Sequence, residues 1–174
     1  MKVAVIGAGH MGRYHAEKLA RCEGVQFAAV VDADRARAAK LGEELGCRAV
    51  ADYKDIVHRA DAAVIAVPTD RHHEVALACL RGGMHVFVEK PIARTVAEAD
   101  ELIAAAESRR LVLQVGHVER YNKAFRALAA QAEAFVSAVL QQQPTQIDGA
   151  EGRRALKLAL DIGRLVRERL QRFA

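Results

Sequence analysis

An acid and an amine stand side by side in residues 86–93, which read VFVEKPIA. Glu89 and Lys90 follow an apolar run typical of a buried strand, and Pro91 comes directly after them. Proline restricts the residue before it to extended conformations, which helps to aim the Lys90 side chain. An ammonium group there can hydrogen-bond the oxygen of a carbon that exchanges a hydride. The alternative interpretation is a surface ion pair ahead of a turn.

A glycine-rich motif near the N-terminus predicts where a cofactor binds. Residues 7–12 read GAGHMG and match G-x-G-x-x-G, after the first predicted strand and at the start of the first predicted helix. Gly7 permits the tight turn, Gly9 lets the backbone approach a pyrophosphate, and Gly12 allows close packing of helix on strand. The helix N-terminus favours the anion. The candidate cofactor contacts in this motif are Gly7, Gly9, His10, Met11 and Gly12.

The acidic residue at the end of the second predicted strand indicates which dinucleotide is preferred. Asp32 lies twenty residues beyond Gly12, where a carboxylate accepts hydrogen bonds from both ribose hydroxyls and repels a 2′-phosphate. This favours NAD over NADP, although Arg35 and Arg37 keep NADP open. A glycine turn without a ligand, followed by a capping Asp, is the alternative interpretation.

The fourth predicted strand runs into VIAVPTDRHH at the same edge of the sheet. Thr69 is a candidate contact to a ribose or phosphate, or else an ordinary helix cap. Two histidines open the following helix and are expected on the surface by default. The candidate cofactor contacts of this segment are Val67, Pro68, Thr69 and His72.

Apolar runs alternate with helical patterns and must position these groups. A parallel sheet covered on both faces explains the near-continuous Val/Ile/Ala strands, so we predict a doubly wound α/β fold of about six strands. Thr95 and Glu98 form a capping box. The predicted strands are Val3–Ile6, Gln26–Val31, Arg48–Val50, Ala62–Val67, His85–Val88 and Leu111–Val115; the predicted helices are Arg13–Arg21, Asp34–Leu45, His72–Arg81 and Val96–Arg109.

Two amphipathic helices are predicted after the last strand, which divides the chain into a dinucleotide-binding domain (1–122) and a helical segment (123–174). Asp148 and Glu151 resemble an N-terminal cap between the two helices. The apolar faces comprise Leu128, Ala132, Phe135, Val136 and Val139 in the first helix, and Ala155, Leu158, Ala159, Ile162, Leu165 and Val166 in the second.

Composition excludes several classes of protein. The 174 residues are 52% hydrophobic and 28% charged, which suits one domain with a core, and no apolar run reaches the roughly 18–20 residues of a membrane span. Three scattered cysteines predict neither a disulfide framework nor a metal site. The net charge of +4 lies largely in the C-terminal helix, which indicates a solvated face rather than a nucleic-acid site. We expect a cytoplasmic protein.

Taken together, these motifs resemble the Gfo/Idh/MocA oxidoreductase family. The match comprises G-x-G-x-M-G-R-x-H, Asp32, Pro68 with His72 four residues later, and Glu89-Lys90-Pro91. The resemblance implies an NAD(P)-dependent sugar dehydrogenase in which Lys90 is catalytic or orients substrate and Glu89 contacts the nicotinamide ribose. QVGHVERYN is similar to a subgroup that oxidises nucleotide-linked N-acetylamino sugars, which implies substrate contacts from Arg120, Tyr121 and Asn122. The subgroup usually follows that Asn with Pro, whereas Lys123 stands here.

One departure from the family bears on activity. The family carries a second domain, an open and largely antiparallel sheet that builds the sugar pocket and supplies a histidine proton acceptor. Here AFRALAA passes directly to QAEAFVSAV. His117 is a substitute base or a plain loop residue. Three interpretations follow: a minimal oxidoreductase, a non-catalytic NAD-binding module, and a chain reduced to its dinucleotide-binding core. The face that the sheet once covered is either repacked by the C-terminal helices or left for self-association.

Overall fold

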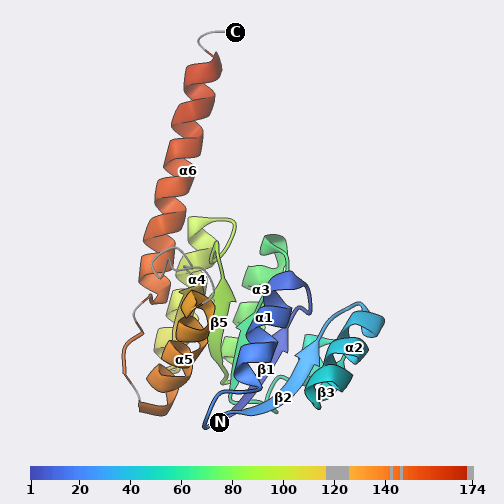
Figure 1. Ribbon diagram of the computed structural model, residues 1–174. Helices are drawn as coiled ribbons and strands as arrows, with labels where there is room; N and C mark the ends of the chain where they lie inside the picture. The colour runs from blue at the N-terminus through green and yellow to red at the C-terminus, as the bar shows by residue number, and fades with distance from the viewer. Residues whose placement is uncertain (117–125, 142, 146, 172–174) are drawn as a thin grey trace.

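The computed structural model describes residues 1–116, 126–141, 143–145 and 147–171, without the side chains of residues 126–131 and 165–171. A six-stranded parallel sheet runs through the centre in the order β3-β2-β1-β4-β5-β6 (Figure 1). The direction of strand order reverses between β1 and β4, which opens a crevice at their carboxyl ends. The strands are β1 (Lys2–Ile6), β2 (Gln26–Val31), β3 (Arg48–Val50), β4 (Ala62–Ile65), β5 (His85–Glu89) and β6 (Leu113–Gly116).

Helices cover both faces of the sheet, as the near-continuous apolar strands predict. One face carries α1, α2 and α5, and the other carries α3, α4 and α6. The doubly wound α/β fold is therefore confirmed. The helices are α1 (His10–Leu19), α2 (Arg35–Leu45), α3 (His72–Arg81), α4 (Val96–Ser108), α5 (Arg126–Gln141) and α6 (Gly149–Gln171), with short 3-10 helices η1 (Tyr53–Asp55) and η2 (Thr69–Arg71).

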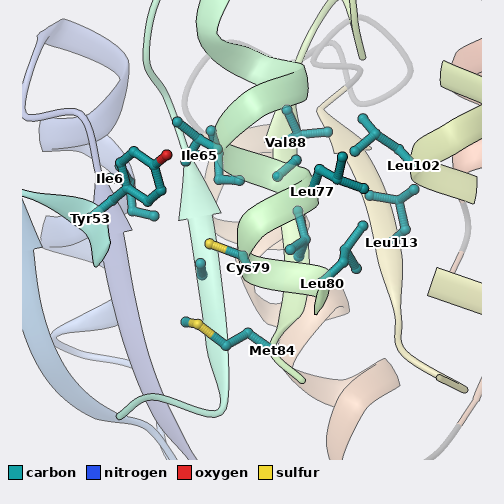
Figure 2. Close-up of a cluster of buried hydrophobic side chains, with 14 of the residues drawn as sticks. Ile6, Tyr53, Ile65, Leu77, Cys79, Leu80, Met84, Val88, Leu102 and Leu113 are labelled. Carbon is teal, nitrogen blue, oxygen red and sulfur yellow. The ribbon is translucent and has the colours of Figure 1, made fainter. Parts of the chain in front are cut away.

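Two apolar cores, one on each face, hold the layers together. Figure 2 shows the first, where Leu77 and Leu80 of α3 pack against strand residues such as Ile65 and Val88. In the second, the rings of Phe87 and Phe135 meet edge to face with centroids 6.0 Å apart, which fixes α5 on the sheet.

Several boundaries differ from the sequence-based predictions. α1 begins at His10, three residues earlier than predicted, because the glycine loop leads directly into the helix. β4 ends at Ile65 rather than Val67, and the Val67 carbonyl instead lies 2.9 Å from Nε2 of His72. Both predicted N-caps are confirmed: the N–H of Glu98 donates to Oγ1 of Thr95, and the N–H of Glu151 donates to Oδ1 of Asp148. The reciprocal bond of the predicted capping box differs, because the Glu98 carboxylate accepts the N–H of Arg94 instead of that of Thr95.

The outer edge of β6 is covered by the segment that leads into α6. Gln114 pairs with Asp148 in an antiparallel bridge, and the N–H of Val115 donates to the carbonyl of Ile147 at 3.1 Å. A Cβ atom on Gly152 would lie 2.5 Å from Cγ2 of Val115, so glycine is what permits α6 to approach this closely.

Where the side chains of α6 are described, its predicted apolar face does not pack on the core. Leu156 is 7% exposed against the core, whereas Leu158 and Ile162 are 61% and 51% exposed. The close approach at Gly152 turns a different side of the helix toward β6, and the C-terminal half of α6 extends away from the sheet (Figure 1). Among the described residues, no helix is both long and apolar enough to cross a membrane.

Candidate cofactor site

The loop between β1 and α1 has a shape that two of its glycines make possible. Gly7 has a φ of +98°, and a Cβ there would lie 2.4 Å from the carbonyl oxygen of Ala66. A Cβ on Gly12 would lie 1.6 Å from the carbonyl oxygen of Gly7, so Gly12 packs directly beneath the turn. Gly7 and Gly12 therefore build the loop from within.

Gly9, unlike Gly7 and Gly12, has no neighbouring atoms on the side where a Cβ would stand, so the outer side of the loop is open. A Cβ built on Gly9 meets nothing within 4 Å, and its backbone is extended. As the N-cap of α1 it offers no side chain to the first turn, so the N–H groups of that turn remain for an anion.

Asp32 joins the glycine loop to the end of β2. Its Oδ2 accepts the N–H of Ala8 at 2.8 Å, and its Oδ1 accepts the N–H of Asp34 at 2.9 Å. The guanidinium of Arg37 lies 3.4 Å from the same Oδ2. A carboxylate oxygen accepts two hydrogen bonds, so the group keeps acceptor capacity for a ribose hydroxyl.

A cavity of about 790 Å³ opens over this loop at the carboxyl edge of the sheet. Its size falls in the range of cofactor sites, and the open side of Gly9 faces it. The residues present thus fit the adenosine and pyrophosphate parts of a dinucleotide. Of the residues predicted from the sequence, the cavity is lined by Gly7, Gly9, His10, Met11, Asp32, Val67 and Pro68.

Part of the cavity lining is formed by residues that the sequence analysis missed. The hydroxyl of Tyr53 donates to Oε1 of Glu74 at 2.8 Å, and Nε of Arg71 lies 3.4 Å from Oε2 of Glu74. Burial, reinforced by Glu74, raises the pKa of Tyr53 to about 12, and the hydrogen bond from Tyr53 lowers the pKa of Glu74. Tyr53 and Lys54 follow the carboxyl end of β3, and this position could have identified them as candidate site residues from the sequence.

His72 lies inside the protein, which corrects its expected surface position. It is 1% exposed, with Nε2 2.9 Å from the carbonyl oxygen of Val67 and Nδ1 2.7 Å from that of Pro91. His72 thereby connects the turn after β4 to the turn after β5. Neither His72 nor Thr69 lines the cavity.

Glu89 and Lys90 lie at the carboxyl end of β5, outside the lining of this cavity. Lys90 is exposed, precedes a cis peptide bond to Pro91, and has no ion pair within the described part of the chain. Glu89 is 8% exposed, and its Oε1 lies 2.6 Å from Nε2 of His15. The sequence analysis included His15 as the last residue of the family motif but gave it no role. The predicted substrate contacts Arg120, Tyr121 and Asn122, and also His117, lie outside the described residues.

Comparison with known proteins agrees with this arrangement. A family model described as an oxidoreductase family with an NAD-binding Rossmann fold, GFO_IDH_MocA, matches residues 1–117. UDP-N-acetylglucosamine 3-dehydrogenase of Acidithiobacillus ferrooxidans is 41% identical over 128 residues, which are 74% of this chain and 40% of that protein. The chain thus spans about 40% of the length of the curated relatives it matches.

Solved structures extend the likeness to the C-terminal part. A structure of the same Acidithiobacillus ferrooxidans enzyme superposes with a TM-score of 0.88 over 93% of this chain and 96% of that one, and at 23% identity this shows the fold alone. GenD2 from gentamicin A biosynthesis, solved in complex with NAD, is 34% identical, with a TM-score of 0.63 over 67% of this chain and 34% of that one.

Proposed function

The chain belongs to the Gfo/Idh/MocA oxidoreductase family, and from that premise we propose that it binds NAD in preference to NADP and serves hydride transfer to or from a sugar or nucleotide-sugar carbon. The observation that carries the proposal is the cavity shared by the open side of Gly9 and the carboxylate of Asp32. A pyrophosphate fits the first group and a ribose diol fits the second.

The preference for NAD rests on the charge at the ribose end. Asp32 repels a 2′-phosphate, and its bond from the N–H of Ala8 holds the carboxylate against the glycine loop. Arg37 weakens that repulsion, because its guanidinium lies 3.4 Å from the carboxylate. We therefore propose a preference rather than exclusion of NADP.

Lys90 is the proposed catalytic residue. When bound, the nicotinamide supplies or accepts the hydride. Lys90 stands at the carboxyl end of the strand two places from β1, on the edge that holds the glycine loop. Its ammonium can hydrogen-bond the substrate oxygen and stabilise charge that develops there. Arg120, Tyr121 and Asn122 are the proposed contacts to the sugar.

A second candidate function is a non-catalytic NAD-binding module. The observation that favours it is the place of Lys90, which is exposed and lies outside the lining of the cofactor cavity. Hydride transfer requires the reacting carbon to be held near the nicotinamide, together with a base for the hydroxyl proton.

Two experiments separate these functions. Calorimetric titration of the purified chain with NAD and then NADP tests the cofactor site, and we expect the tighter binding for NAD. Incubation with NAD and UDP-N-acetylglucosamine, followed by NADH absorbance, tests catalysis. An enzyme gives a saturable signal that Lys90→Ala abolishes, whereas a binding module gives binding without signal. Binding of neither cofactor would refute both functions.

A further inference from the structure

A buried histidine–carboxylate pair lies beneath the turn that carries Lys90. Nε2 of His15 is 2.6 Å from Oε1 of Glu89; His15 is fully buried and Glu89 nearly so. α1 supplies the first residue and β5 the second, 74 positions later in the chain. Polar groups so far from water are tolerated when they satisfy one another.

The surroundings fix the Glu89 carboxylate in place. Its Oε2 accepts the backbone N–H of Lys90 at 3.3 Å, and the same oxygen packs on Gly116, where an added Cβ would lie only 2.8 Å away. The ring of Phe87 packs edge-on against His15 with centroids 5.0 Å apart. The carboxylate is therefore held between β6 and α1.

The unpaired atom of His15 identifies the protonation pattern of the pair. Nδ1 of His15 is buried without a hydrogen-bond partner in the described part of the chain. A charged imidazole, or a protonated Glu89 donating to Nε2, would leave a buried N–H at Nδ1 unsatisfied. A neutral ring that donates from Nε2 to an ionised Glu89 leaves only a lone pair there, which is the less costly arrangement. We assign this tautomer from geometry, and it gives the pair one negative charge.

We infer that His15 is a positioning residue that holds Glu89 ionised and buried, so that the site binds oxidised cofactor more tightly than reduced cofactor. The inference rests on the proposed function, in which the nicotinamide end lies at the carboxyl end of β5. The oxidised nicotinamide ring carries a positive charge and the reduced ring carries none. A fixed carboxylate in a poorly solvated place favours the charged form.

The test compares three ligands on the purified chain: ADP, NAD and NADH. ADP shares the adenosine and pyrophosphate contacts but lacks the nicotinamide and its ribose, so it reports on the part of the site that does not involve Glu89. We expect Glu89→Gln and His15→Phe to reduce the preference for NAD over NADH by roughly fivefold to tenfold, the order expected for one partly screened charge. The Kd of ADP should stay within about twofold, because its contacts include neither Glu89 nor His15.

Two further variants serve as controls. Glutamine has an N–H that reaches where Nε2 of His15 lies, so His15→Gln should retain most of the preference. His73 and Glu101 form a pair of the same chemistry at 2.8 Å on the surface, and Glu101→Gln should leave the preference unchanged.

The outcomes separate the inference from the proposed function. Failure of the wild-type chain to bind ADP refutes the proposed function and, with it, the inference. Normal ADP binding with the same NAD-to-NADH preference in Glu89→Gln as in the wild type overturns the inference alone. Glu89→Gln keeps the shape of the pair, so the test does not depend on whether His15→Phe folds.

Discussion

The ring of His72 connects to the carbonyl of Pro91 across nineteen residues of sequence, with Nδ1 2.7 Å from the oxygen. Its other nitrogen lies 2.9 Å from the carbonyl oxygen of Val67. One buried side chain thus holds together the turn after β4, which lines the cavity, and the turn after β5, which carries Lys90.

Replacing this ring should destabilise the protein. We expect His72→Ala to lower the free energy of unfolding by about 2 kcal/mol or more, because it creates a cavity and removes the ring N–H that hydrogen-bonds a buried carbonyl. Urea denaturation followed by circular dichroism measures the change. His73→Ala is the matched control, since His73 is only partly buried and its partner Glu101 is exposed; a similar loss in both variants would contradict the bridging role.

Two glycines of the G-x-G-x-x-G motif should respond in opposite ways to alanine. Gly12→Ala forces a Cβ into the carbonyl of Gly7 and should cost several kcal/mol of stability, roughly 3 or more. Gly9→Ala adds its methyl group to open space and should change stability by less than about 1 kcal/mol, yet weaken NAD binding at least about tenfold. Thermal melting and calorimetry on both variants decide this. Unchanged NAD affinity in Gly9→Ala would place the pyrophosphate elsewhere.

Asp32 and Arg37 should shift cofactor preference in opposite directions. Asp32→Ala removes the ribose acceptor and frees the guanidinium, so the preference for NAD over NADP should fall by at least about tenfold. Arg37→Ala removes the neutralising charge and should strengthen the preference. Asp52 lines the same cavity, so Asp52→Ala serves as a control. An equal fall of the preference in Asp32→Ala and Asp52→Ala would show that cavity charge alone, and not the position of Asp32, sets the choice.

Ionisation of Tyr53 should lower the free energy of unfolding at alkaline pH. Its pKa is raised to about 12, chiefly by burial, so the folded chain holds the phenol proton more tightly than the unfolded chain does. This stabilisation is complete below the unfolded pKa of about 10 and is lost as the pH rises toward 12.

Wild-type stability should therefore fall relative to Tyr53→Phe by about 2 kcal/mol between pH 9.5 and pH 12. Urea denaturation of both proteins in reductant, at matched pH values, gives the difference and cancels the titration of other groups. Parallel curves would mean that Tyr53 ionises as freely in the folded chain as in the unfolded one.

Two neighbouring leucines of α6 should differ sharply. Leu156 packs into the core and Leu158 is 61% exposed, so Leu156→Ala should cost about 2–4 kcal/mol and Leu158→Ala less than about 0.5 kcal/mol. Chemical denaturation at several protein concentrations measures both. A cost for Leu158→Ala that grows with concentration would show that this face is buried between copies of the chain.

The sequence predicts the sheet well because each strand is a local signal. Apolar runs bounded by turn residues mark β1, β2 and β5 within about one residue, and the alternation with helices specifies parallel pairing. The start of α1 at His10 was not predicted, because the residues of the glycine motif lack the apolar periodicity that indicates a helix.

Contacts between distant residues explain the part of the site that could not be predicted. Tyr53 meets Glu74, and His15 meets Glu89, only after strand order has placed β3 and β5 on either side of β1 and β4. The apolar pattern of α6 was also insufficient to identify the face that packs, because the helix has apolar residues on more than one side. Close approach at Gly152 determines that side.

The segment around Ile147 has a consequence for how copies of this chain meet in concentrated solution. An outer strand with free backbone groups is a template on which another chain can add a strand, and such addition propagates into aggregates. Here the backbone of β6 already hydrogen-bonds Ile147 and forms a bridge with Asp148. The opposite outer strand, β3, is three residues long and begins with a charged Arg48. Both borders of the sheet are thus poor starting points for edge-to-edge polymerisation.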